Sequence, residues 1–244
     1  VGNVPGLKSI SLALKSGQII GLAGVSGNGQ ASFAEVVGGL HKPNEGQLVL
    51  NGNTVMKWSP RDAVISGIAR IPEDRHKTGS IADFDLTENT ILERYNTNTF
   101  SKGGWLNWQN SRAFANHIID KYDVRCPGAD TPIRLLSGGN MQKLILGRVL
   151  ETDPQIILAN QPVRGLDIGA VNYVHSQLLA ARDRGAAVLL ISEDLDEIMA
   201  LSDVIHVIFN GRLSPRFERG EMTPAQLGIW MGGQGFDGEV NHAT

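Results

Sequence analysis

The stretch that decides the fold is Leu136-Ser137-Gly138-Gly139-Asn140-Met141-Gln142-Lys143, which opens an apolar-periodic run ending near Leu150. A serine followed by two glycines is typical of a helix start, because the serine oxygen can cap the first backbone N–H groups. Such a turn also presents N–H donors and the positive end of the helix dipole to anions. Taken alone, the stretch favours the plain interpretation of a helix start with an N-cap serine.

A second glycine-rich turn lies near the N-terminus, at Gly24-Val25-Ser26-Gly27-Asn28-Gly29-Gln30-Ala31. The apolar run 19–23 before it predicts a buried strand, and 31–40 after it predicts a helix. This context suits a P-loop, whose backbone N–H groups hold phosphates. The motif G-x-x-x-x-G-K-[ST] keeps its outer glycines, but Gln30 replaces the lysine and Ala31 the hydroxyl residue. For this stretch alone, a tight turn without a ligand has equal weight.

Strand-like and helical runs alternate along most of the chain, which predicts an α/β fold with a mainly parallel sheet. The pattern 47–56 predicts an antiparallel β hairpin with a glycine turn. We expect a core at about 1–74 and 151–232, an inserted helical subdomain at about 75–150, and a mobile tail after Gly232. The further strands are expected at 155–159, 187–191 and 204–209, and the further helices at 61–66, 87–95, 108–122, 136–150, 169–183, 194–201 and from Thr223-Pro224.

Composition narrows the class of protein. Hydrophobic residues make up 41% and charged residues 19% of 244, so a sizeable core can be buried. The net charge of −3 and the lack of a basic stripe argue against a nucleic-acid partner. No apolar run approaches the length of a transmembrane helix, and the N-terminus lacks the pattern of a signal peptide. The single cysteine, Cys126, excludes an internal disulfide and fits a reducing compartment.

With its other motifs, the chain resembles the ABC transporter ATPases from about residue 7 to residue 232. In that family L-S-G-G-x-Q is the signature motif, which matches Leu136 to Gln142. The resemblance is closest to the C-terminal half of tandem ATPases that serve simple-sugar and nucleoside importers, and it implies a P-loop NTPase (RecA-like) core. The other matching segments are Asn160-Gln161-Pro162-Val163 after the Walker B strand, Gly165-Leu166-Asp167 at the D-loop, Ser192-Glu193-Asp194 at the switch and Ile71-Pro72-Glu73-Asp74-Arg75 at the Q-loop.

The departures from the family fall on the residues that carry its chemistry. Gln30 lacks the charge that the lysine gives to the phosphates, and Ala31 offers Mg²⁺ no ligand. Asn160 and Gln161 replace the metal-binding aspartate and the catalytic glutamate, and neither amide is a general base near neutral pH. Glu193 replaces the switch histidine with a like charge next to phosphate. We therefore expect no catalytic residues in this site, weak ATP binding and no Mg²⁺, although each substitution alone could be an ordinary polar residue.

The resemblance implies that the signature surface is intact and completes the ATP site of a partner. The residues assigned to it are Leu136, Ser137, Gly138, Gly139, Asn140, Gln142 and Asp167, and those assigned to this chain's own nucleotide are Gly24, Gly27, Asn28, Gly29, Gln30, Ala31 and Ser32. The implied partners are a second nucleotide-binding half fused upstream, permease subunits that contact Glu73, and through them a substrate-binding protein. The implied place is the cytoplasmic face of the cell membrane. Val1 to Ser9 contains no aromatic residue for adenine stacking, so either the fragment starts late in a longer tandem chain, which we favour, or adenine stacking is missing.

Some residues and functions stay open. Tyr95, Trp105 and Trp108 lie in the region that meets the permease, but core packing is the favoured role for each. Arg75 and Lys77 are expected in a solvated loop, with a permease contact as the alternative. The histidine spacing suggests no zinc site. The alternative functions are an active ABC ATPase that works through unusual residues and a soluble ABC protein outside transport.

Overall fold

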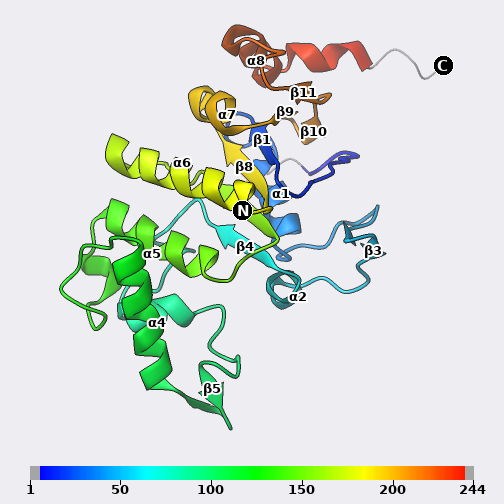
Figure 1. Ribbon diagram of the computed structural model, residues 1–244. Helices are drawn as coiled ribbons and strands as arrows, with labels where there is room; N and C mark the ends of the chain where they lie inside the picture. The colour runs from blue at the N-terminus through cyan, green and yellow to red at the C-terminus, as the bar shows by residue number, and fades with distance from the viewer. Residues whose placement is uncertain (1–5, 240–244) are drawn as a thin grey trace. The chain divides into compact units, whose positions relative to one another are not determined.

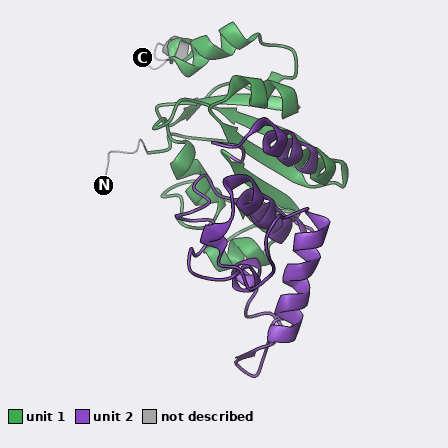
Figure 2. Cartoon of the chain, turned by 90° about the vertical axis from the view of Figure 1, so that its left-hand side faces the viewer, with its two compact units in different colours: residues 1–70, 155–161, 178–244 green, residues 71–154, 162–177 purple. Residues whose placement is uncertain are grey.

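The computed structural model describes residues 6–239, which divide into two compact units (Figure 2). Unit 1 comprises residues 1–70, 155–161 and 178–244, and unit 2 comprises residues 71–154 and 162–177. The helix α6 (Ile168–Asp183) begins in unit 2 and ends in unit 1, and β4 (Ile68–Ile71) ends at the first residue of unit 2.

A seven-stranded sheet forms the centre of unit 1 (Figure 1), with the order β10-β9-β1-β8-β7-β4 and with β11 paired to β9. The strand β1 pairs in parallel with β8 and β9, and β7 pairs in parallel with β8. The short strands β10 and β11 pair antiparallel with β9. The bounds are β1 (Ile19–Ala23), β7 (Ile156–Asn160), β8 (Ala187–Ser192), β9 (Val204–Phe209), β10 (Arg212–Leu213) and β11 (Phe217–Glu218).

The central strands form because their sequences are nearly continuous apolar runs, which suit strands that are covered on both faces. Every residue of β1 and β8 is buried. The core cluster joins these strands to α1 (Gln30–Val37) through Phe33 and Ala34. The remaining helices of unit 1 are α2 (Pro60–Ile65), α7 (Leu195–Leu201), α8 (Pro224–Met231) and the 3₁₀ helix η2 (Gln234–Glu239).

A separate two-stranded hairpin in unit 1 joins β2 (Val49–Leu50) to β3 (Asn53–Thr54). Its turn is Asn51-Gly52, and both residues have a positive φ, as a type I′ turn requires. The hairpin packs beside a small cluster around Trp58. The antiparallel hairpin predicted at 47–56 is therefore present, with shorter strands.

Unit 2 is mainly helical and packs α3 (Leu86–Ile91), α4 (Trp108–Lys121) and α5 (Gly138–Leu150) against one another. A capping box at Asp85 and Glu88 starts α3. The carboxylate of Glu151 accepts hydrogen bonds from Lys121, Tyr122 and His117 at the end of α5. Burial alone would raise the pKa of Glu151, but these three partners bring it below its ordinary value. The small elements are η1 (Ile133–Leu135) and the hairpin of β5 (Ser101–Lys102) with β6 (Trp105–Leu106).

The α/β fold with a mainly parallel sheet is confirmed, and two local expectations, on the aromatic residues and on one helix end, are wrong. Tyr95, Trp105 and Trp108 are exposed, Trp105 by 82%, because the β5–β6 hairpin carries that ring away from the helical core. The segment after Gly232, expected to be mobile, forms the 3₁₀ helix η2, and Phe236 packs on Trp230 with ring centroids 5.1 Å apart. The helix expected at 87–95 already ends at Ile91.

Candidate functional site

The residues assigned to this chain's own nucleotide meet at one edge of the unit 1 sheet. Because β1, β7 and β8 run parallel, their carboxyl ends lie at the same edge. The register pairs Ala23 with Ser192 and Asn160 with Ile191. The turn after β1, the end of β7 and the residue after β8 are therefore neighbours, and this edge is where open α/β sheets bind ligands.

The glycine-rich turn after β1 has a backbone that only glycine adopts easily. Gly27 has φ 89° and Gly29 has φ 116°, and Gly29 is the N-cap of α1. Asn28 ties the turn to the β9–β10 connection, because its side-chain oxygen accepts from the Asn210 N–H at 3.0 Å and its carbonyl from the Gly211 N–H at 2.8 Å. The P-loop shape predicted for residues 24–31 is thus retained, including the helix start that would face phosphate.

The side chain of Gln30 folds back into this turn. Its Nε2 donates to the Val25 carbonyl at 2.8 Å, and its Oε1 accepts from the Asn28 N–H at 3.1 Å. Gln30 is 7% exposed, and a Cβ on Gly24 would lie only 2.5 Å from its Nε2. The amide therefore occupies a backbone donor that a P-loop offers to phosphate. The sequence alone indicated that Gln30 lacks the charge of a lysine, and the structure adds that its donor and acceptor atoms are used within the loop.

Two further positions at this edge, Asn160 and Gln161, carry neutral amide side chains. Gln161 adopts the left-handed region with φ 49°, which is uncommon for a residue other than glycine, and its N–H donates to Ile191 at 2.8 Å. Asn160 is half-buried at the end of β7. Glu193 is exposed after β8 and precedes Asp194, which caps α7. The edge thus offers two neutral amides and one carboxylate, and the side chains of Ala31 and Ser32 next to them add no charge.

The signature turn lies in unit 2 and is differently arranged. Ser137 is the N-cap of α5, and its oxygen accepts from the Asn140 backbone N–H at 3.4 Å and from Asn140 Nδ2 at 3.0 Å. Ser137 is exposed, and Gly138 and Gly139 are half-buried. Because the hydroxyl oxygen accepts from its own helix, its hydrogen stays available as a donor. Leu136 is buried beneath the turn.

Two side chains join the signature helix to the segment after β7. The buried Gln142 donates from Nε2 to the Pro162 carbonyl at 2.7 Å. Asp167 accepts from the Ala170 N–H at 3.0 Å at the start of α6, and its Oδ2 lies 3.7 Å from the position that a Cβ on Gly139 would take. The signature and the D-loop, 136–142 and 165–167, are therefore adjacent in one unit.

The segment with Glu73 also belongs to this part of unit 2. Glu73 forms an ion pair with Arg164. Arg75 donates from Nη1 to the Arg164 carbonyl at 2.8 Å, so the expectation of a solvated loop is wrong for Arg75. It holds for Lys77, which is exposed. Sequence reasoning missed Arg75 as a neighbour of the signature, and no motif signals it, because the acceptor lies 89 positions along the chain.

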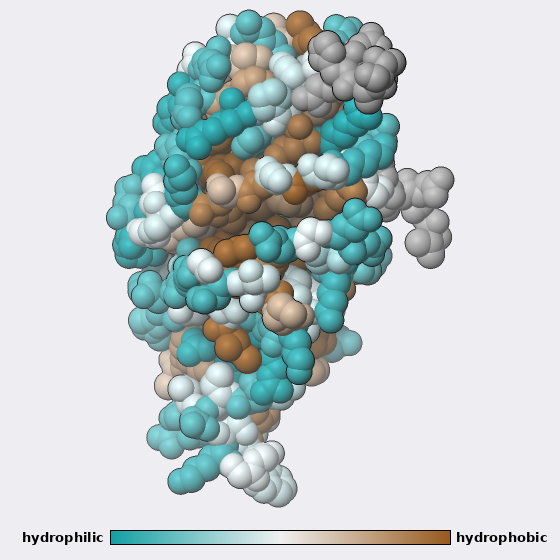
Figure 3. Space-filling model, turned by 90° about the vertical axis from the view of Figure 1, so that its right-hand side faces the viewer, coloured by the Kyte–Doolittle hydropathy of each residue, from teal (hydrophilic) through white to brown (hydrophobic). Residues whose placement is uncertain are grey.

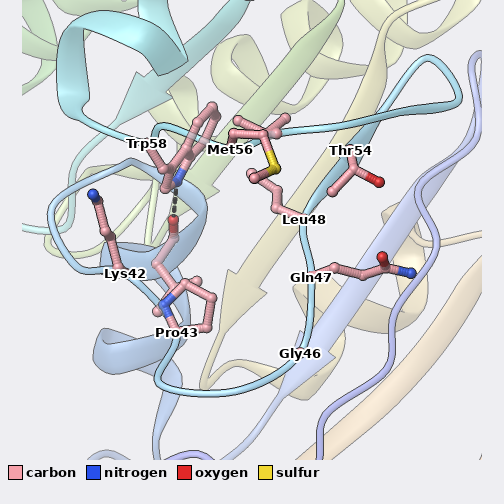
Figure 4. A pocket seen from close by; sticks show the side chains of 10 residues that line it. Lys42, Pro43, Gly46, Gln47, Leu48, Thr54, Met56 and Trp58 are labelled. Carbon is pink, nitrogen blue, oxygen red and sulfur yellow. Dashed lines mark hydrogen bonds between the residues drawn. The ribbon is translucent and has the colours of Figure 1, made fainter.

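A cavity of about 220 Å³ lies in unit 1 between the end of α1 and the β2–β3 hairpin (Figure 4). Trp58 forms one wall and donates from its indole N–H to the Val36 carbonyl at 2.6 Å. Lys42 is its one ionisable lining residue, and none of the residues assigned to nucleotide lines it. Leu40, Val49 and Met56 are exposed near the hairpin, and Figure 3, viewed from the hairpin's side, shows apolar side chains among polar ones. We assign no ligand to this cavity.

Within residues 6–236, no three His, Cys, Asp or Glu side chains gather closely enough to hold a metal ion. In the same residues, no helix combines the length and the apolar character needed to cross a bilayer.

Comparison with known proteins connects this geometry to a family. The model of the family described as "ABC transporter" matches residues 7–164. The guanosine import ATP-binding protein NupO of Bacillus subtilis is 45% identical over 227 residues, which are 93% of this chain and 44% of that protein. The nucleoside import ATP-binding protein NupA of Lactococcus lactis is 37% identical over 93% of this chain and 45% of its own length. The chain spans less than half the length of these relatives.

Solved structures agree on the fold. One ATP-binding cassette of an ABC transporter superposes with a TM-score of 0.78 at 21% identity and covers 96% of this chain and 93% of its own. A nucleotide-free ATP-binding cassette gives a TM-score of 0.75 at 20% identity, with 94% of each chain covered. The family match extends from the residues before β1 through the glycine-rich turn and the signature to Arg164. This chain belongs to the ABC transporter family.

Proposed function

We propose that this chain is a nucleotide-binding domain of an importer for simple sugars or nucleosides. In this proposal its own site does not hydrolyse ATP, and its signature surface completes the ATP site of a second nucleotide-binding half. The observation that carries the proposal is the contrast between its two glycine-rich turns. The turn of unit 1 is filled by its own Gln30, whereas the turn of unit 2 keeps its outward donors.

The loss of hydrolysis follows from the side chains at the sheet edge. A general base must accept a proton from the attacking water, and the amide of Gln161 cannot do so near neutral pH. Ala31 and Asn160 leave Mg²⁺ without its hydroxyl and carboxylate ligands. Phosphate binding would also have to displace Gln30 from the Asn28 N–H. ATP therefore binds weakly here, with little contribution from Mg²⁺.

The role of unit 2 follows from its donors. The first N–H groups of α5 have no acceptor within the helix, and they carry the positive end of its dipole. With the Ser137 hydroxyl they can stabilise negative charge on a γ-phosphate held by the partner half. Asp167 and Gln142 hold the neighbouring segments against this turn. The chain thus contributes one wall of a composite active site.

The transport role rests on the relatives. NupO and NupA are named as import ATP-binding proteins for guanosine and for nucleosides, and each is about twice as long as the segment matched here. We therefore propose a second nucleotide-binding half fused upstream, permease subunits, and a substrate-binding protein reached through them, at the cytoplasmic face of the membrane. Glu73 and the exposed Tyr95, Trp105 and Trp108 are the proposed permease contacts, because aromatic residues are enriched in interface hot spots.

ATP turnover by the assembled two-half protein tests this proposal. We expect Ser137→Arg, which fills the signature surface, to lower turnover by at least about 100-fold, comparable to losing oxyanion donors. Gln161→Ala, the matched change in this chain's own site, should leave turnover within about twofold, since the amide supplies no base.

Calorimetry on the 244-residue chain gives an independent test. We expect weak ATP binding that Mg²⁺ barely changes. Tight Mg²⁺-dependent binding, together with hydrolysis by this chain alone that Gln161→Ala abolishes, would instead establish the alternative of an active ATPase domain.

A further inference from the structure

Arg75 occupies an unusual place at the start of the signature helix. It lies in the segment between β4 and α3, and its guanidinium rests against the first residue of α5. Its Nη2 lies 3.1 Å and its Nε 3.4 Å from the position that a Cβ on Gly138 would take. A Cβ on Gly165 would lie 3.6 Å from the same Nη2. The guanidinium therefore lies beside both the signature turn and the D-loop turn.

The backbone of Arg75 is held firmly enough to aim this side chain. Ser80 donates from its hydroxyl to the Arg75 carbonyl at 2.8 Å. A Cβ on Gly79 would lie 2.8 Å from the Arg75 Cα, so the segment folds closely onto itself there. The Asp74 carboxylate accepts from the His76 and Lys77 N–H groups at 3.0 and 2.9 Å, which closes the turn that follows Arg75.

The charge of Arg75 lacks a neutralising partner. Its one hydrogen bond goes to the neutral Arg164 carbonyl, and its Nε is buried without a partner. Glu73, two positions earlier in the chain, is paired with Arg164 instead. No carboxylate in residues 6–236 forms an ion pair with Arg75. A cation beside a helix N-terminus is unfavourable unless an anion approaches, because the dipole is positive there.

We infer that Arg75 is a positioning residue of the signature surface. Its guanidinium holds the Gly138 and Gly165 turns in one fixed arrangement and adds positive charge beside the donors that face the partner's γ-phosphate. This inference rests on the proposed function. The positive charge of Arg75 stabilises the transferred phosphoryl group more in the transition state than in bound ATP. It therefore raises kcat more than it lowers KM.

The experiment measures ATP turnover by the assembled two-half protein. Arg75→Ala should lower kcat by about tenfold or more, with KM changed by less than about threefold, as expected when an interaction in the transition state is lost. Added guanidinium at non-denaturing concentration should restore much of kcat, because it fits the space between the two glycines. Arg75→Lys should recover part, since it keeps the charge and loses the planar fork. Arg134→Ala is the matched control, because Arg134 is exposed in the same unit and pairs with Asp83.

Hydrogen exchange on the 244-residue chain separates the inference from the proposed function. Arg75→Ala should speed amide exchange at residues 138–140, and guanidinium should slow it again, whether or not a partner half is present. If Ser137→Arg leaves turnover intact, the proposed function fails. If Ser137→Arg abolishes turnover while Arg75→Ala keeps its kcat and its exchange rates, the inference about Arg75 is overturned. A loss of kcat without rescue, with a lowered unfolding midpoint, would overturn it as well.

Discussion

The glycine-rich turn of unit 1 and the signature turn of unit 2 start from the same local design. Each leads into a helix N-terminus, where backbone donors and the helix dipole favour an anion. In unit 1 the side chain of Gln30 returns to the loop and takes its Asn28 N–H. In unit 2 the capping Ser137 accepts only from Asn140 of its own helix. Two similar turns can therefore differ in the donors they offer, because in one of them a side chain of the same loop accepts from a backbone N–H.

Removing the hydrogen bond from Gln142 to the Pro162 carbonyl, near the signature turn, should have the largest effect on stability. Gln142→Met keeps the side chain's length but leaves the buried Pro162 carbonyl without its donor. We expect a loss of about 1–3 kcal/mol in the free energy of unfolding, the usual cost of an unsatisfied buried acceptor. Chemical denaturation measures it, with the exposed Gln109→Met of α4 as control, for which less than about 0.5 kcal/mol is expected. Equal losses of unfolding free energy in the two variants would contradict the view that Gln142 stabilises the signature turn.

Adding a charge and a hydroxyl to the unit 1 turn should have the next largest effect, on ATP affinity. The double change Gln30→Lys and Ala31→Ser restores a positive charge and a hydroxyl, and we expect ATP affinity to rise about tenfold, or about 1.4 kcal/mol. Gln30→Met is the control, because it removes the hydrogen bonds to Val25 and Asn28 without adding charge. A rise with Gln30→Met alone would show that the folded-back amide itself limits binding. If ATP affinity rose with neither variant, the view that only its side chains keep this turn from binding phosphate would be contradicted.

The smallest effect concerns the pH dependence of unit 1. Burial lowers the pKa of His206, and its Nδ1 lies 3.1 Å from the Ser214 carbonyl, to which a neutral imidazole donates. The unfolded chain then binds a proton more readily than the folded one, so stability is full above about pH 6.5 and falls as the pH drops toward the folded pKa. The expected change, reduced by solvent screening, is under about 1 kcal/mol.

Denaturation curves at pH 7.5 and 5.5 measure this effect. His206→Asn should flatten the difference between the two curves, even if it lowers stability at both values. An unchanged difference would mean that other groups carry the pH dependence of unit 1.

The elements that could be predicted were those with a clear local sequence pattern, such as a run of apolar residues. The strands β1, β8 and β9 are long apolar runs, and they appear within one residue of their expected bounds. The strands β10 and β11 hold two residues each, too few for a period to show, and only their pairing with β9 defines them.

The sequence pattern placed the two glycine-rich turns between their neighbouring elements, but it did not give the contacts of their side chains. The motif spacing located the two turns, yet it could not show that the Gln30 amide bonds within its own loop, because a rotamer depends on the folded backbone. Arg75 was assigned to a solvated loop because its neighbour Gly138 is distant in sequence and has no side chain to suggest a contact. Trp105 was assigned to the core because the sequence pattern does not reveal a hairpin whose strands hold two residues each.

The left-handed backbone at Gln161 has a consequence for redesign. A residue other than glycine held there costs on the order of 1 kcal/mol, and the bond from its N–H to Ile191 helps to maintain it. The chain path at the end of β7 is therefore preserved independently of the group it carries. Placing a carboxylate there would need only a changed side chain, as in Gln161→Glu, and no rebuilt loop. In evolutionary terms, a carboxylate at this position is within reach of one side-chain substitution.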